Sequence, residues 1–326
     1  SFPGPAGKRT TDAWATIAGL VHETSTLRHG TMVSPVTYRH PANVAKVVAT
    51  IDEMSGGRVE LGLGAGWNEV EHRRHGLAFY DRITRIEMME EQFQIVRGFW
   101  SQGPGWSFEG RHYTVEDTQY APRPVQQPGI PLIMGTIGVP RGLRTAARWS
   151  DHLNLNTIDP DGTAETLGRF RETCAAVGRD PDEIVTSVLC AVAVGADRAE
   201  ADRRIATLVE TMEFESAASF ETERGGSWAV GTPDQAANTI RAYADAGVDM
   251  INLSCHYVTE QQSDLSEVCR MVPEAAVYLE ITYVNHRYPK PTGPRISANE
   301  VYRKMTAEQF TTAAHLAYAR GGSGVS

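Results

Sequence analysis

The sequence is poor in cysteine, has no excess of positive charge and contains no long apolar run. Its four cysteines, Cys174, Cys190, Cys255 and Cys269, show no Cys-x-x-Cys spacing, which predicts reduced thiols and no metal site. A net charge of −9 argues against a nucleic acid or an anionic membrane as partner. No apolar run reaches the length of a membrane span, and we expect no signal peptide before Thr10. These absences predict a cytoplasmic protein.

Several motifs of common enzyme classes are absent as well. No Gly-x-Gly-x-x-Gly lies between a strand and a helix with an acidic residue about 20 positions further on, so a Rossmann dinucleotide site is not supported. The sequence has no Gly-x-Ser-x-Gly, no P-loop and no His-Glu-x-x-His motif. What remains is an ordinary globular composition, 326 residues with 41% hydrophobic and 22% charged residues, which suits one large domain or two small ones.

Predicted strands alternate with predicted helices along the whole chain. Strands are expected at Leu27–Pro35, Val59–Gly64, Pro131–Thr136, His152–Thr157, Ile184–Val194, Met250–His256, Val277–Asn285 and Ser323–Ser326. Helices are expected at Thr11–Glu23, Pro41–Met54, Tyr80–Trp100, Gly142–Arg148, Ala164–Val177, Arg198–Phe220, Asp234–Ala246 and Thr306–Arg320, with an insertion loop at Ser101–Pro128. Strands separated by helices in this number predict an α/β protein, a (β/α)8 TIM barrel. Because the chain opens on a helix and closes on a strand, the barrel is expected to be circularly permuted or chimeric.

The end of the second predicted strand is almost free of side chains. Gly62, Gly64 and Gly66 lie two positions apart and therefore face one side of the strand. A bare strand end lets a flat ring or a phosphate approach the backbone, although the same glycines could serve only close strand packing. Trp67 could contact a ligand or lie at the rim. Asn68 could contact a cofactor, cap the following helix, or do both.

Several motifs carry a resemblance to a known family. They are Gly30-Thr31-Met32-Val33-Ser34-Pro35 with Arg39-His40-Pro41, Ser55-Gly56-Gly57-Arg58 through Gly66-Trp67-Asn68-Glu69, Tyr80-Asp81-Arg82, Phe108-Glu109-Gly110 with Tyr113, and Pro131-Leu132-Ile133-Met134-Gly135. From about Ser1 to Val268 the chain resembles the bacterial luciferase-like monooxygenase superfamily, and within it the branch of oxidoreductases that use coenzyme F420.

The resemblance implies a (β/α)8 barrel that holds an isoalloxazine-type ring at its C-terminal mouth, with F420 as the cofactor and FMN as the alternative. Met32 and Val33 fall where relatives carry a bulge or a non-proline cis peptide behind the ring. Backbone N–H groups at the start of a helix would hold the phosphate, with charge added by Arg141 or Arg144. The cofactor-binding residues so implied are Met32, Val33, Ser34, Gly62, Gly64, Asn68, Gly135, Thr136, Ile137 and Gly138.

Catalytic groups are harder to assign. The family's early strand that ends in an Asp-His pair has no counterpart in this sequence, and Ala65 stands where some sugar-phosphate dehydrogenases carry a Glu. Two histidines remain as candidates for acid–base work, His256 at a strand end and His72 in a charged run that would usually be a solvated face. Asn154 and Asn252 alternate with apolar neighbours on their strands, and they are expected either to contact a ligand or to form a buried polar layer.

The last segment differs from the rest of the chain. Residues 277–326 weakly resemble a βα unit of a different barrel, of the glycoside-hydrolase kind, and we expect them to complete a barrel whose luciferase-like portion is residues 1–276. The predicted function is an F420- or flavin-dependent oxidoreductase that transfers a hydride between the cofactor ring and an organic substrate. The alternative is a catalytically inactive or engineered chimeric TIM-barrel scaffold. A homodimer is also expected.

Overall fold

The computed structural model describes residues 11–156, 158–254, 268, 271–272 and 277–280. These residues form two compact units. The first contains Thr11–Asn154 and Arg169–Val185, and the second contains the described residues from Leu155 to Gly168 and from Thr186 to Glu280. The helix predicted at Thr306–Arg320 and the strand predicted at Ser323–Ser326 lie outside the described residues.

The first unit is built on strands that follow one another in the sheet in the order β1 (His29–Pro35), β2 (Val59–Gly64) and β5 (Leu132–Thr136), and on the first residues of β6 (His152–Asn156). β1 pairs with β2, and β2 pairs with β5, both in parallel. The apolar side chains of β2 and β5 are fully buried, as expected for strands with both faces covered. Parallel pairing brings the carboxyl ends of these strands to one edge.

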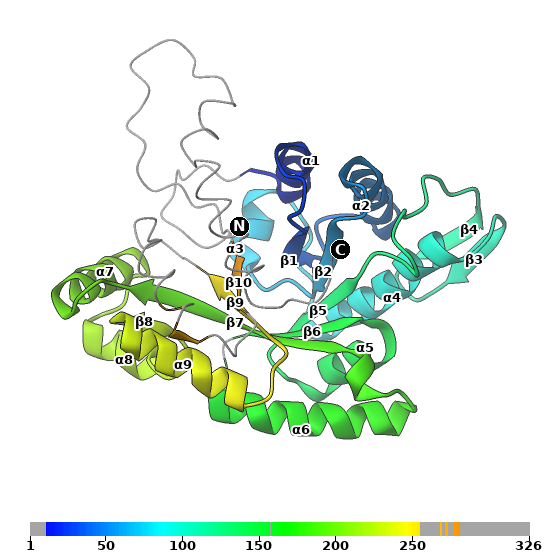
Figure 1. The fold of residues 1–326 in the computed structure, drawn as a ribbon. Coiled ribbons are helices and arrows are strands. Elements are labelled where there is room, and N and C mark those ends of the chain that lie inside the picture. The colour runs from blue at the N-terminus through cyan, green and yellow to red at the C-terminus, as the bar shows by residue number, and fades with distance from the viewer. Residues whose placement is uncertain (1–10, 157, 255–267, 269–270, 273–276, 281–326) are drawn as a thin grey trace, which may run out of the picture. The chain divides into compact units, whose positions relative to one another are not determined.

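Helices cover these strands (Figure 1). α1 (Ala13–Glu23) packs on α2 (Pro41–Ser55), α2 packs on α4 (Arg82–Ser101), and α4 packs on α5 (Pro140–Trp149). Their ends carry ordinary capping signals. Asp81 accepts hydrogen bonds from the backbone N–H groups of Ile83 and Thr84 at the start of α4, and Gly56 ends α2 with a φ of 67°.

The segment predicted as an insertion loop, Ser101–Pro128, contains an antiparallel hairpin of β3 (Trp106–Glu109) and β4 (Thr114–Thr118). The loop prediction was therefore wrong for these residues. Trp106 lies on α4 so closely that a Cβ at Gly98 would be 2.1 Å from its indole ring. This contact, like the hydrogen bonds that hold the hairpin turn, joins residues far apart in sequence. The sequence around the hairpin is rich in proline and glycine, which favours a loop prediction, and such distant contacts cannot be predicted from it.

In the second unit β7 (Val185–Val194) pairs in parallel with β8 (Ala229–Gly231) and with β9 (Met250–Ser254). β9 also pairs in parallel with β10 (Val277–Glu280), where Val277 lies opposite Ile251. α6 (Pro160–Val177) begins in this unit, and α9 (Pro233–Asp245) packs on β8 and β9. The strand predicted from Val277 is thus present in its first four residues.

The helix predicted over Arg198–Phe220 is in fact two helices, α7 (Arg198–Thr211) and α8 (Ala217–Arg224). Glu213 takes a φ of 60° between them, and Ser216 starts α8 with a reciprocal capping box to Ser219. Both helices then contribute to one apolar cluster around Phe220, so the break lets two short helices cover the same core. An apolar period of 3.6 residues does not reveal such a break.

Candidate cofactor site

The end of β1 carries an irregular turn of backbone. The Met32–Val33 peptide bond is cis, and the pairing with β2 changes register between Thr31 and Ser34. A chain of hydrogen bonds holds this bulge in place. Trp14 Nε1 donates to Ser34 Oγ (3.1 Å), Ser34 Oγ donates to Thr31 Oγ1 (3.1 Å), and Thr31 Oγ1 donates to the carbonyl of Gly62 (3.1 Å). The buried Ser34 hydroxyl therefore supports the bulge, which does not favour its predicted contact with a cofactor.

Val33, together with the carbonyl of Thr31, explains why three neighbouring positions are glycines. A Cβ at Gly64 would lie 2.4 Å from Val33 Cγ2, and a Cβ at Gly135 would lie 2.8 Å from Val33 Cγ1. At Gly62 a Cβ would meet the carbonyl oxygen of Thr31 at 2.0 Å and Val33 Cγ1 at 3.0 Å. The bare face of β2 and β5 is thus filled by the Val33 side chain. We call Val33 with Gly62, Gly64 and Gly135 the valine wall. Contact of its backbone with a cofactor stays a prediction.

The loop after β2 turns sharply and presents an indole. Gly66 has a φ of 77°, a conformation that favours glycine, and Trp67 is 67% exposed. Asn68 then caps α3 (Glu69–Arg74) by accepting from the Glu71 N–H at 3.1 Å. The capping role predicted for Asn68 is confirmed, whereas its contact with a cofactor remains a prediction.

His72 belongs to the run that was expected to be a solvated face, yet its side chain is only 1% exposed. Its Nδ1 lies 2.7 Å from the carbonyl oxygen of Asn68, and its Nε2 lies 2.6 Å from Thr37 Oγ1. Because a carbonyl only accepts, Nδ1 carries a proton. Tyr38 and Phe79 contact the ring edge-on. With both nitrogens engaged and the ring buried, these contacts favour a structural role and do not support acid–base catalysis by His72.

The turn from β5 into α5 is the segment predicted to hold a phosphate. Gly138 has a φ of 81°, and its N–H donates to Thr136 Oγ1 at 3.3 Å. Val139, the N-cap residue of α5, makes no side-chain cap hydrogen bond, and Pro140 follows as the first helical residue. The remaining N–H groups of the first helical turn are therefore not occupied by a capping side chain. Ile137, at the tip of the turn, is 58% exposed.

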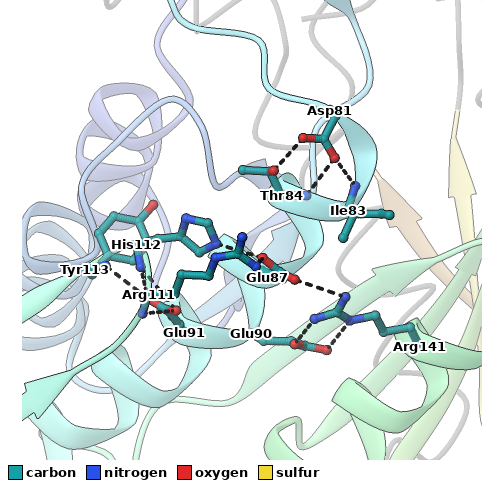
Figure 2. Close-up of polar contacts among 10 residues, drawn as sticks. All are labelled: Asp81, Ile83, Thr84, Glu87, Glu90, Glu91, Arg111, His112, Tyr113 and Arg141. Carbon is teal, nitrogen blue, oxygen red and sulfur yellow. Dashed lines mark hydrogen bonds and ion pairs between the residues drawn. The ribbon is translucent and has the colours of Figure 1, made fainter.

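Arg141, suggested above as a phosphate ligand, is engaged elsewhere (Figure 2). Its Nε and Nη2 donate to the two carboxylate oxygens of Glu90 on α4, at 3.0 and 2.8 Å. The hydroxyl of Thr145 donates to the same carboxylate at 3.0 Å. These hydrogen bonds to Glu90 raise the pKa of Arg141. The guanidinium therefore joins α5 to α4, and Arg144, the other candidate, is exposed.

Two further carboxylates of α4 hold the β3–β4 turn (Figure 2). Glu87 Oε2 accepts from His112 Nε2 at 3.0 Å and from Arg111 Nη1 at 2.9 Å, and the hydrogen bond from His112 is the main cause of its lowered pKa. Glu91 accepts from the backbone N–H groups of Arg111, His112 and Tyr113 at distances of 2.7 to 3.3 Å. Sequence reasoning missed this network. The only signal was three glutamates at positions i, i+3 and i+4 of one helix.

The structure places two of the three polar residues that were predicted to be functional on later strands. Asn252 is buried and donates from Nδ2 to Ser187 Oγ at 3.1 Å, which favours the buried polar layer. Asn154 is 2% exposed on β6. His256, the other catalytic candidate, lies outside the described residues.

The strands are parallel and joined by helices, and their carboxyl ends lie at one edge of the sheet. This places the chain in the class of α/β proteins whose ligand sites form at the carboxyl ends of strands. The model of the luciferase-like monooxygenase family matches residues 2–250. The chain therefore belongs to the luciferase-like monooxygenase family, as the sequence motifs predicted.

Individual relatives are distant. An uncharacterized protein of Mycobacterium tuberculosis is 32% identical over 55% of this chain and 62% of its own length, so the alignment covers less than two thirds of that relative. The FMNH2-dependent dimethylsulfone monooxygenase of Pseudomonas putida is 29% identical over 65% of this chain and 64% of its own length. Family homologues thus include flavin-dependent monooxygenases.

Among solved structures, an F420-dependent secondary alcohol dehydrogenase in complex with an F420–acetone adduct superposes with a TM-score of 0.65 at 21% identity, over 77% of this chain and 80% of its own. This likeness, together with the family match, confirms the predicted α/β TIM-barrel class. The permuted or chimeric strand order remains a prediction. Within the described residues no helix is both long and apolar enough to span a membrane.

Proposed function

We propose that this protein is a cofactor-dependent oxidoreductase that transfers a hydride between F420 and an organic substrate, with FMN as the alternative cofactor. The observation that carries the proposal is the uncapped first turn of α5 after β5, beside the valine wall. The expected cofactor-binding positions are the wall, Asn68 and the turn from Gly135 to Gly138. Luciferase-like enzymes bind a small-molecule cofactor and substrate, and these positions lie at the carboxyl ends of the strands, where such a ligand would bind.

The first turn of α5 fits a phosphate group on physical grounds. Helix N-termini offer free N–H groups and the positive end of the helix dipole, which together favour an anion. Gly138 gives the turn its left-handed backbone, and Val139 does not cap the helix with its side chain. The residues present therefore suit a phosphate that is bound by backbone groups.

The choice of F420 over FMN rests on charge. A terminal phosphate monoester carries about −1.5 to −2 charges near pH 7, whereas a phosphodiester carries one. Arg141, the cation nearest in sequence to the turn, is already neutralised by Glu90 at 3.0 and 2.8 Å. Backbone N–H groups alone suit the single charge of the F420 phosphodiester better.

When bound, a deazaflavin or flavin supplies a ring that accepts or donates a hydride. The chain's own residues would position that ring and exclude water. The valine wall would support one side of the ring, because the Val33 side chain fills the space that its glycines leave open. Trp67 and Ile137, both largely exposed, would cover the ring with apolar surface.

The test is a titration of the purified chain with F420 and, separately, with FMN, followed by fluorescence. We expect micromolar binding of F420 and weaker binding of FMN. The Gly138→Ala variant should weaken F420 binding, because an alanine is strained at a φ of 81°. Gly129→Ala is the matched control, since a Cβ at Gly129 meets nothing within 4 Å.

Two outcomes would contradict the proposal. If neither cofactor binds while the chain still unfolds cooperatively, the inactive or engineered scaffold is the better description. If FMN binds more tightly than F420, the charge argument at the α5 turn is wrong and FMN becomes the assigned cofactor.

A further inference from the structure

A cavity of about 640 Å³, wide open to solvent, lies in the first unit, at the far ends of α4 and α5 from the phosphate turn. It is lined by Gln94, Arg97 and Ser101 from one face of α4, by Trp106 and Phe108 of β3, and by Trp149 at the end of α5. α5 has 10 residues, so the cavity and the turn are roughly 15 Å apart along the helix. The cavity is therefore separate from the proposed cofactor site, and its open side leaves part of any small molecule bound there in contact with solvent.

Aromatic rings form one side of this cavity. Trp106 and Phe108 point to the same side of β3, with ring centroids 6.3 Å apart and planes inclined by 35°. Gly98 lets the indole of Trp106 lie directly on the backbone of α4. Trp149 adds a second, half-buried indole. A flat apolar ligand could pack against these aromatic side chains, and such packing favours aromatic molecules.

Two of the three arginines at the cavity have structural partners. Arg97 donates to Asp151 Oδ1 at 2.6 Å and to the carbonyl of Trp149 at 3.3 Å. Arg179 donates to the carbonyl of Ala147 at 3.4 Å and lies 3.6 Å from Glu183. Both guanidinium groups thus satisfy the last carbonyls of α5 and neutralise the two acids at the cavity.

Arg148 is the third arginine at the cavity. It is exposed in the last turn of α5, and it forms no ion pair or side-chain hydrogen bond among the residues that the structure describes. With the other charges paired, it leaves the cavity with one excess positive charge. A free guanidinium binds a carboxylate through two parallel hydrogen bonds.

We propose that this cavity binds a small aromatic carboxylate, with the ring packed on Trp106 and the carboxylate paired with Arg148. Binding there does not depend on the proposed cofactor chemistry. The ligand would be a separate effector or a second substrate, and the cavity would recognise its single negative charge and its flat apolar ring.

The test uses 2-naphthoate as the probe and its neutral analogue 2-naphthamide, each titrated into the full chain by calorimetry. We expect saturable binding of 2-naphthoate and markedly weaker binding of the amide. Arg148→Gln should weaken 2-naphthoate binding by about tenfold, as for the loss of one charge-assisted pair. Arg144→Gln is the matched control, because Arg144 is exposed on the same helix outside the cavity.

A second pair of variants locates the ring. Trp106→Phe should weaken binding, and Trp67→Phe, which alters the exposed indole after β2, should leave it unchanged. The proposal is overturned if millimolar 2-naphthoate shows no saturable binding, if the two arginine variants behave alike, or if only Trp67→Phe reduces affinity. Because the titration omits F420 and FMN, its result is independent of the cofactor test.

Discussion

At the scale of single residues, the packing at the carboxyl ends of β1, β2 and β5 depends on one side chain. Val33 fills the space that Gly62, Gly64 and Gly135 leave open, so the glycines are required by packing inside the protein. We predict that Gly64→Ala lowers the free energy of unfolding by about 1–3 kcal/mol, the usual range for overpacking. Its Cβ would meet Val33 Cγ2 at 2.4 Å. Chemical denaturation measures the change.

The double variant Val33→Ala/Gly64→Ala separates this contact from other causes. Removing the valine methyl groups should recover much of the loss, which a double-mutant cycle reports as a favourable interaction term. Gly19→Ala in α1 is the control, since its Cβ meets nothing within 4 Å. It should raise stability by roughly 0.5–1 kcal/mol through helix propensity. Additive effects of the two wall substitutions would contradict the valine wall.

At the scale of elements, the contact between α4 and α5 depends on charge as well as packing. The Glu90–Arg141 pair has the fork geometry that makes such pairs strong, although both side chains are partly exposed. We predict that Glu90→Gln lowers the free energy of unfolding by about 1 kcal/mol, discounted for solvent screening. The loss should shrink at high salt, because screening weakens the pair in the parent protein.

Glu116→Gln on β4 is the matched control for this charge change, since Glu116 is exposed and no hydrogen bond or ion pair is found for its side chain among the described residues. It should leave stability within a few tenths of a kcal/mol of the parent. An equal loss in both variants, or a loss that is unchanged by salt, would show that the charge on Glu90 does not hold the two helices together.

The elements themselves were predictable to different degrees. β2 occupies the predicted residues, and α2 ends one residue later than predicted, because periodic apolar residues and clear caps mark both. The β3–β4 hairpin and the break between α7 and α8 were not predictable. Trp106 owes its place to Gly98, and Phe220 of α8 packs with Leu208 of α7 and Ala193 of β7, so both features depend on contacts between segments.

At the scale of the whole molecule, the role of the last segment can be tested through β10. β10 covers one edge of β9 with parallel pairing from Val277 to Glu280. An exposed strand edge invites association with other chains. We predict that a chain ending at Ala276 is less stable and less soluble than a chain ending at Glu280. Thermal unfolding and sedimentation compare the two.

The full-length chain is the reference for this pair. If residues 277–326 complete the barrel, as we propose, the chain ending at Glu280 should itself be less stable than the full chain. Equal stability and solubility of all three chains would show that the last segment is not part of the fold, and would contradict the proposed division at residue 277.

The candidate site was predictable as segments but not as contacts. The motifs around Met32, Gly62 and Gly135 pointed to a strand edge in a luciferase-like fold, and the family match confirms that resemblance. Three contacts did not follow from the sequence: the burial of His72, the hydrogen-bond chain through Ser34 and the pairing of Arg141 with Glu90. Each joins side chains whose orientations are decided only when several elements pack together.

The valine wall also limits how this edge of the protein can change over generations. A larger residue at position 33 needs space that Gly64 and Gly135 now provide, and a side chain at either glycine needs a smaller residue at position 33. At Gly62 the carbonyl of Thr31 excludes a side chain whatever residue stands at position 33. Neither change is easily accepted first, so variation at Val33, Gly64 and Gly135 should occur in linked steps. The carboxyl ends of these strands are therefore expected to vary less among descendants than the exposed loops around them.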